Sequence, residues 1–169
     1  MPLRLMMLCL ALFSSGAFAK DKTGPGFLRE RHAGIQATVS SRPVAELFPE
    51  LLSAIEACYV GTTDPSKVGV YGVVGSMTAA SRTVHGERSE DGRSAYIQVR
   101  ARSAFGWIES AFLQVDLDSI ELGTRVTAYH ERNVELQRSF LTHVNDWVAG
   151  NSKSCPPDPF MRKPVVETP

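Results

Sequence analysis

The cysteines are the residues whose chemistry the sequence constrains most closely. Of the three, Cys9 lies in an apolar N-terminal run, whereas Cys58 and Cys155 lie far apart in the rest of the chain. If Cys9 is removed with a signal peptide, two cysteines remain in the mature chain. An even number of cysteines in an exported protein predicts a disulfide, and two cysteines leave one pairing, Cys58–Cys155. Two free thiols are the alternative. A metal site is disfavoured because neither residue has a histidine or another cysteine at ligand spacing.

The four histidines are the other candidates for chemistry. His143 and Asp146 are three residues apart on a predicted helix, close enough to touch, and His130 falls on the inward face of a predicted strand. These three residues form a candidate polar site. The nucleophile patterns G-x-S-x-G and S-x-x-K and the zinc pattern H-E-x-x-H are absent from the sequence. We therefore predict no catalytic residue, no metal and no cofactor, and a hydrolase that uses His130 or His143 is the least favoured reading.

The N-terminus has the organisation of a secretory signal peptide. Arg4 precedes the apolar run Leu5–Phe13, and small residues lead to a cleavage site after Ala19. The run is too short to cross a bilayer, so a retained membrane anchor is the weaker alternative. Lipid attachment at Cys9 is disfavoured because the preceding Leu8 is large. We expect residues 1–19 to be removed and the protein to be periplasmic or secreted.

Composition narrows the class of protein and its partners. The formal net charge is zero, so nothing indicates binding to nucleic acid or to an anionic membrane surface. Residues 20–42 are polar and glycine-rich at their start and suggest a flexible lead-in, with a short strand at 35–39 as an option. Residues 43–155 suit a single domain, and the proline-rich residues 156–169 suit a mobile tail.

Hydrophobic periodicity predicts the elements that position these residues. Apolar residues at helical spacing indicate one helix over 43–58, which either kinks at Pro49 or begins there, and a second over 133–150. Between them, glycine-containing and alternating segments predict four strands, at 68–83, 95–102, 111–118 and 125–131. The charged segment 85–92 reads as a loop. The expected fold is α+β, a two-layer α-β-β-β-β-α arrangement with an antiparallel four-stranded meander, two helices on one face and one disulfide.

Alternation fixes the expected register of the meander. Odd-numbered residues face inward in the strands at 95–102 and 111–118, which requires an odd loop such as 104–106. Even-numbered residues face inward in the next strand, so a four-residue loop at 120–123 pairs Asp118 with Arg125 and places His130 opposite Leu113. The disulfide would then pin two helices that run in the same direction over one face of the sheet.

The outward face of this meander carries the most distinctive surface in the sequence. Aromatic, arginine and amide side chains of the kinds enriched in protein interfaces project there. An ordinary solvated sheet face and a homodimer formed by stacking two such faces are alternatives. The candidate binding face consists of Tyr96, Arg100, Arg102, Phe112, Gln114 and Tyr129.

The function that follows is binding rather than catalysis. We expect a small exported interaction protein whose partner is an envelope or secreted protein, bound through the sheet face or the 85–92 loop. The alternative is a small-ligand carrier with a pocket between the helices and the sheet, because small inward residues would leave space there. Those residues are Ala95, Ala101, Ala111 and Ala128.

Overall fold

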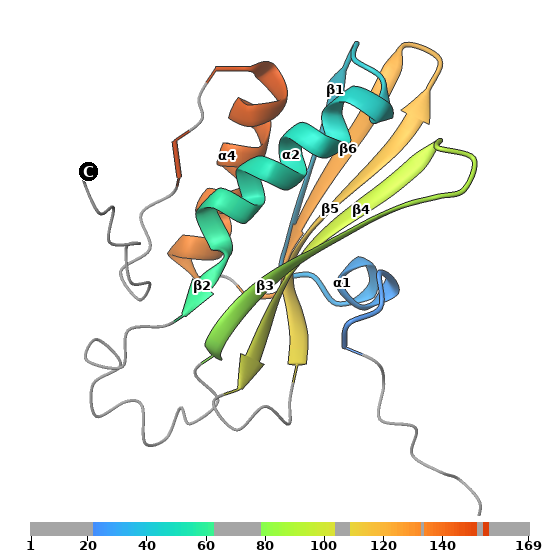
Figure 1. Cartoon of the computed structure of the whole chain (residues 1–169). Helices are drawn as coiled ribbons and strands as arrows, with labels where there is room; N and C mark the ends of the chain where they lie inside the picture. Colours follow the sequence, from blue (N-terminus) through green and yellow to red (C-terminus); the bar gives the residue numbers. More distant parts are fainter. Residues whose placement is uncertain (1–21, 63–78, 104–108, 133, 152–153, 156–169) are drawn as a thin grey trace, which may run out of the picture.

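The computed structural model describes residues 22–62, 79–103, 109–132, 134–151 and 154–155 (Figure 1). Several expectations lie outside these residues. They are the signal peptide at 1–19, most of the predicted strand at 68–83, the hairpin loop at 104–106, Asn133 as a helix cap and the tail at 156–169.

The chain forms an α+β fold around one antiparallel sheet. The strand order is β1-β6-β5-β4-β3-β2, in which β3 to β6 form the expected meander. Two strands extend the predicted four: β1 pairs with β6 along its whole length, and β2 is a two-residue edge beside β3. The strands are β1 Gly34–Ser40, β2 Gly61–Thr62, β3 Ala79–Arg88, β4 Ser94–Ser103, β5 Glu109–Ile120 and β6 Gly123–His130.

In the described part of the chain, three helices cover the two faces of this sheet. The long helices α2 (Val44–Tyr59) and α4 (Glu135–Ala149) lie over one face, and the short helix α1 (Gly26–Glu30) lies against the other (Figure 1). Helix α2 continues through Pro49, and Gly150 ends α4 in the left-handed conformation expected of a C-terminal glycine. Within the described residues, no helix is both long enough and apolar enough to cross a membrane.

The disulfide predicted from cysteine counting is present. Cys58, in the last turn of α2, is bonded to Cys155 beyond α4, with the two Cα atoms 5.2 Å apart and a sequence separation of 97 positions. The expected parallel direction of the helices is wrong, because β1 runs antiparallel to β6 and feeds α2 from the opposite end of the sheet. Helix α2 therefore runs down as α4 runs up (Figure 1).

The main hydrophobic core lies between the sheet and the two long helices. Leu47, Leu51 and Ile55 of α2 and Phe140 and Val144 of α4 are almost fully buried there. They lie at helical spacing, so each helix presents one apolar stripe to the sheet. The strands contribute Ile97, Val99, Leu113, Val115, Leu117, Val126 and Ala128 to the same cluster.

The register of the meander follows the sequence expectation in its central part. Asp118 lies opposite Arg125 and Leu113 lies opposite His130, as the even loop between β5 and β6 required. The predicted charged loop at 85–92 is shorter than expected. Strand β3 extends to Arg88, and the turn closes through a hydrogen bond from the Ser89 amide to the Ser94 carbonyl.

A β-bulge overturns two inward–outward assignments on β5. Val99 lies opposite Leu113, but the next residue, Arg100, lies opposite Ala111, which leaves Phe112 as the extra residue. A bulge turns the residues beyond it to the other face. Phe112 therefore joins the core under the helices, with the Arg82 guanidinium 5.5 Å from its ring centre, and Ala111 faces α1 instead of the core.

The lead-in expected to be flexible is built into the fold over residues 22–42. Phe27 and Leu28 of α1 are buried at 6% and 0% exposure against Ala111, with Tyr129 alongside them. Helix α1, which carries two residues of this second small cluster, lies on the sheet face opposite the long helices (Figure 1). The sheet is therefore covered on both faces near its centre, which explains why every residue from Ala111 to Leu117 is buried.

Candidate functional site

The outer sheet face carries a buried chain of polar side chains. Gln98 and Gln114 are fully buried and lie opposite each other on β4 and β5. The Gln98 side-chain amide donates to Gln114 Oε1 at 2.9 Å, and the Gln114 amide donates to Asp116 Oδ1 at 2.7 Å. Arg100 adds two hydrogen bonds to Gln98 Oε1, at 2.9 and 3.1 Å. Buried amides of this kind are stable only when their polar atoms are satisfied, as they are here.

The same side chains hold the backbone of the N-terminal segment on the sheet. Arg100 donates to the Thr23 carbonyl at 3.0 Å, Gln98 to the Gly24 carbonyl at 3.2 Å and Gln114 to the Pro25 carbonyl at 3.0 Å. Three successive carbonyls are therefore bound by three side chains of the sheet. Because the donors are buried or half-buried, these bonds fix where α1 begins.

An ion pair fixes the middle of α1. Arg29 Nε donates to Asp116 Oδ2 at 2.6 Å, with the Asp116 side chain 5% exposed and that of Arg29 47% exposed. The hydrogen bond to Asp116 is the main cause of the raised pKa of Arg29, and burial opposes it. Asp116 also accepts from Gln114, so its buried charge has two donors.

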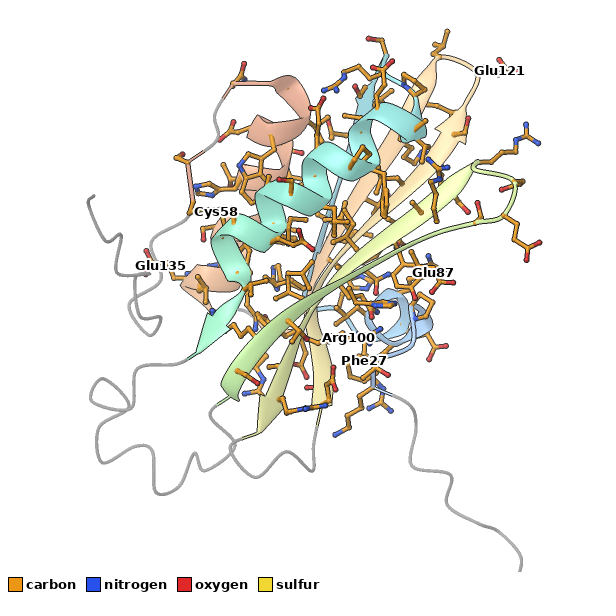
Figure 2. All side chains as sticks on the ribbon, in the orientation of Figure 1. Phe27, Cys58, Glu87, Arg100, Glu121 and Glu135 are labelled. Carbon is orange, nitrogen blue, oxygen red and sulfur yellow. A yellow bond between two sulfur atoms is a disulfide. The ribbon has the colours of Figure 1, made fainter. Side chains whose placement is uncertain are left out.

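A polar hollow of about 480 Å³ lies where α1 meets the strands. Its walls come from α1 and from all four strands of the meander, and they carry acidic, basic and phenolic groups together. Figure 2 labels Phe27 of α1 and, near this helix, Glu87 of β3 and Arg100 of β4. The side chains most relevant to binding are Arg29, Glu87, Tyr96, Asp116, Asp118 and Tyr129.

The two tyrosines of the hollow are held as neutral phenols. Burial, followed by the hydrogen bond with Glu87, raises the pKa of Tyr96 to about 12, and its hydroxyl donates to Glu87 Oε2 at 2.7 Å. Burial and then the negative charge of Asp116 raise the pKa of Tyr129. His32 lies edge-on to the Tyr129 ring, with the ring centres 5.6 Å apart. At neutral pH both hydroxyls therefore remain protonated.

The predicted binding face divides into separate roles. Tyr96 and Tyr129 line the hollow, whereas Arg100 and Gln114 hold the N-terminal segment. Arg102 is exposed and lies 3.4 Å from Glu109, and Phe112 belongs to the opposite face. Residues 23–25 are bound over the outer face, where the sequence suggested the stacking of two copies as an alternative.

The candidate polar site on the helix side is not assembled. His130 is 2% exposed and its ring lies against Gly34, where a Cβ would be 2.2 Å from Nε2. Burial lowers the pKa of His130. The His143 ring is hydrogen-bonded through Nδ1 to the Ser139 carbonyl at 2.8 Å, and no hydrogen bond or ion pair links it to Asp146 or His130 in the described part of the chain. Over those same residues, no three His, Cys, Asp or Glu side chains gather to hold a metal ion.

A second hollow of about 450 Å³ lies between α2 and the C-terminal end of α4. Its lining includes Leu47, Ala54 and Ala57 of α2 and Trp147 of α4. The sequence predicted a pocket between the helices and the sheet, lined by Ala95, Ala101, Ala111 and Ala128, and the lining of this second hollow contains none of these residues. Ala101, Ala111 and Ala128 line neither of these two hollows, and Ala111 lies on the other face of the sheet.

Sequence reasoning missed Arg29, Gln98 and Asp116 as parts of the site. Gln98 and Asp116 occupy alternating polar positions that resemble a solvated strand face, and Arg29 lies in a segment read as a loose lead-in. The available signal was the apolar pair Phe27–Leu28 within that polar segment, because two large apolar residues need a surface to cover.

Comparison of this chain with known protein families, with curated proteins and with solved structures finds no match.

Proposed function

We propose that this chain is an exported binding protein without catalytic activity, and that its hollow beside α1 receives a side chain of an envelope or secreted protein. The observation that carries the proposal is the construction of the hollow. Its wall residue Asp116 is buried and held by Arg29 and Gln114 before any ligand arrives. A site whose groups are already oriented loses less conformational entropy on binding.

Charge and aromatic content favour a partner that presents lysine or arginine. Among the residues that line the hollow, Asp116 neutralises Arg29. The two exposed carboxylates, Glu87 and Asp118, then outnumber the remaining cation, Arg88. The side chain of Glu87 is 63% exposed, so it can accept from a ligand as well as from Tyr96. Two tyrosine rings beside carboxylates suit a cationic group, through cation–π attraction and charge-assisted hydrogen bonds.

Export is part of the proposal and is supported by the disulfide. A bond between Cys58 and Cys155 persists in oxidising compartments, and the N-terminal run has the organisation of a signal peptide. Sequencing of the N-terminus of protein recovered from the exported fraction should begin at Lys20. Recovery of the intact N-terminus from the cytoplasm would contradict export.

Photo-crosslinking in living cells tests the site. Tyr96→p-benzoylphenylalanine should give a covalent adduct with an exported protein, whereas Thr142→p-benzoylphenylalanine, exposed on α4, should not. Glu87→Gln together with Asp118→Asn should abolish the adduct at position 96 by removing both exposed carboxylates. An adduct that survives this double substitution, or that forms equally at position 142, would overturn the proposed site.

A small-ligand carrier is the second candidate, supported by the hollow between α2 and α4. Its volume of about 450 Å³ lies in the range typical of small-molecule sites, and Leu47, Leu51 and Trp147 give it an apolar lining. Native mass spectrometry of protein from the exported fraction should show a bound small molecule that Ala54→Trp displaces. A ligand-free mass in the unsubstituted protein would count against this function.

A further inference from the structure

The two edges of the sheet are built very differently. The β2 edge is two residues long, whereas β1 pairs with β6 over seven consecutive residues without a register shift. On its other side, β1 has no strand partner among the described residues. Soluble proteins usually protect a long edge with charges, proline or a bulge, and the sequence Gly34–Ser40 contains no charged residue and no proline.

The exposed residues of β1 are apolar on one face only. Ile35 and Val39 are 52% and 59% exposed, and Ala37 between them is also exposed. Ile35 lies opposite Tyr129 and Val39 lies opposite Arg125. Ile35, Ala37 and Val39 therefore project from the face that carries α1. The alternate residues Gln36 and Thr38 project from the helix-covered face and are polar.

We propose that β1 pairs in antiparallel orientation with β1 of a second copy of this chain, about a two-fold axis at Ala37. This axis is perpendicular to the sheet and keeps each face continuous, so residues that lie opposite each other project from the same side. Ile35 then lies opposite Val39 of the second copy, and the symmetry repeats the contact. Gln36 lies opposite Thr38 of the second copy on the other face.

The side-chain pattern favours a second copy over an unrelated strand. The register about Ala37 pairs aliphatic with aliphatic on one face and polar with polar on the other, and it brings no charged residue of 34–40 into opposition. Cross-strand aliphatic pairs stabilise such contacts, and the backbone groups of both edges gain partners. The proposal does not depend on the hollow beside α1.

Sedimentation velocity of the full processed chain tests the proposal. The unsubstituted protein should dimerise reversibly across micromolar concentrations. Ile35→Lys with Val39→Lys places like charges opposite each other twice and should raise the dissociation constant by about tenfold or more. Ile35→Lys with Val39→Glu places opposite charges there and should restore dimerisation. Val60→Lys, a 53% exposed residue beside the β2 edge, is the matched control and should change nothing.

Three results would overturn the proposal. The first is a monomer at every concentration of the unsubstituted protein. The second is a dimer that persists in Ile35→Lys with Val39→Lys, which would place the interface elsewhere. The third is failure of Ile35→Lys with Val39→Glu to regain the dimer, since the register about Ala37 requires it. Thermal melting of each variant verifies that these exposed positions leave the fold intact.

Discussion

Replacement of Leu28 by alanine separates a docked N-terminal segment from the loose lead-in that its polar composition suggests. Leu28 is fully buried, in a cluster with Phe27 and Ala111 and beside Tyr129. The cluster is separate from the main core under α2 and α4. The substitution should therefore release residues 22–33 locally and leave the rest of the fold in place.

The size of the effect follows from the burial of Leu28. Truncation of a buried leucine to alanine costs about 2–5 kcal/mol, and the lower part of that range applies here because a peripheral helix can relax into the space. A loss of about 2–3 kcal/mol raises the population of the detached segment by about 30- to 150-fold, at tenfold for each 1.4 kcal/mol.

Limited trypsin digestion measures this population directly. Arg29 and Arg31 lie in the segment, and cleavage there tracks the open population when reclosing is fast. Leu28→Ala should accelerate cleavage by the factor above with little change in melting temperature. Leu122→Ala makes the same truncation at a residue that is 82% exposed and should leave the rate within about threefold. An unchanged rate in Leu28→Ala, or cleavage of the unsubstituted protein as fast as an unfolded peptide, would refute the reasoning.

Three further predictions concern the disulfide and two titrating groups. Cys58→Ser with Cys155→Ser should cost about 4–5 kcal/mol in urea unfolding, because the bond closes a loop of 97 residues; a cost below about 1 kcal/mol would contradict this. Burial lowers the pKa of His130, so below about pH 6.5 the unfolded chain binds more protons than the folded chain. The free energy of unfolding should therefore decrease as the pH is lowered, by up to about 1.4 kcal/mol per pH unit. His130→Gln should flatten this dependence, and urea unfolding at several pH values that gives an unchanged slope would contradict it. Burial and the Glu87 hydrogen bond raise the pKa of Tyr96 to about 12, so one phenol should titrate late in ultraviolet absorbance and earlier in Glu87→Gln; identical titrations would disprove the contact.

The meander and the disulfide could be predicted because they depend on local patterns. Cysteine count gave Cys58–Cys155 directly, and side-chain alternation required an even loop that pairs Asp118 with Arg125. Both inferences need only the period of a strand and the parity of a turn. The predicted direction of α2 was wrong because this direction depends on β1. The pairing of β1 with β6 is a contact between distant parts of the chain.

The candidate site could be predicted only in part. Tyr96 and Tyr129 were identified from their outward positions, but alternation cannot distinguish a solvated face from one covered by another segment. Gln98 and Gln114 look like surface residues in sequence and are fully buried beneath residues 23–25. The bulge at Phe112 also leaves no clear trace in the sequence, since it shifts the register within a continuous apolar–polar pattern.

The position of residues 22–31 on the outer face of the sheet builds the hollow beside α1. A nuclear Overhauser spectrum with selectively labelled methyl groups tests it most directly, because Leu28 and Ala111 share one buried cluster. The structure predicts a strong cross-peak between the Leu28 and Ala111 methyl groups, with the Leu28 resonance shifted by the neighbouring aromatic rings. A Leu28 methyl at its random-coil position, with no cross-peak to Ala111, would contradict the account.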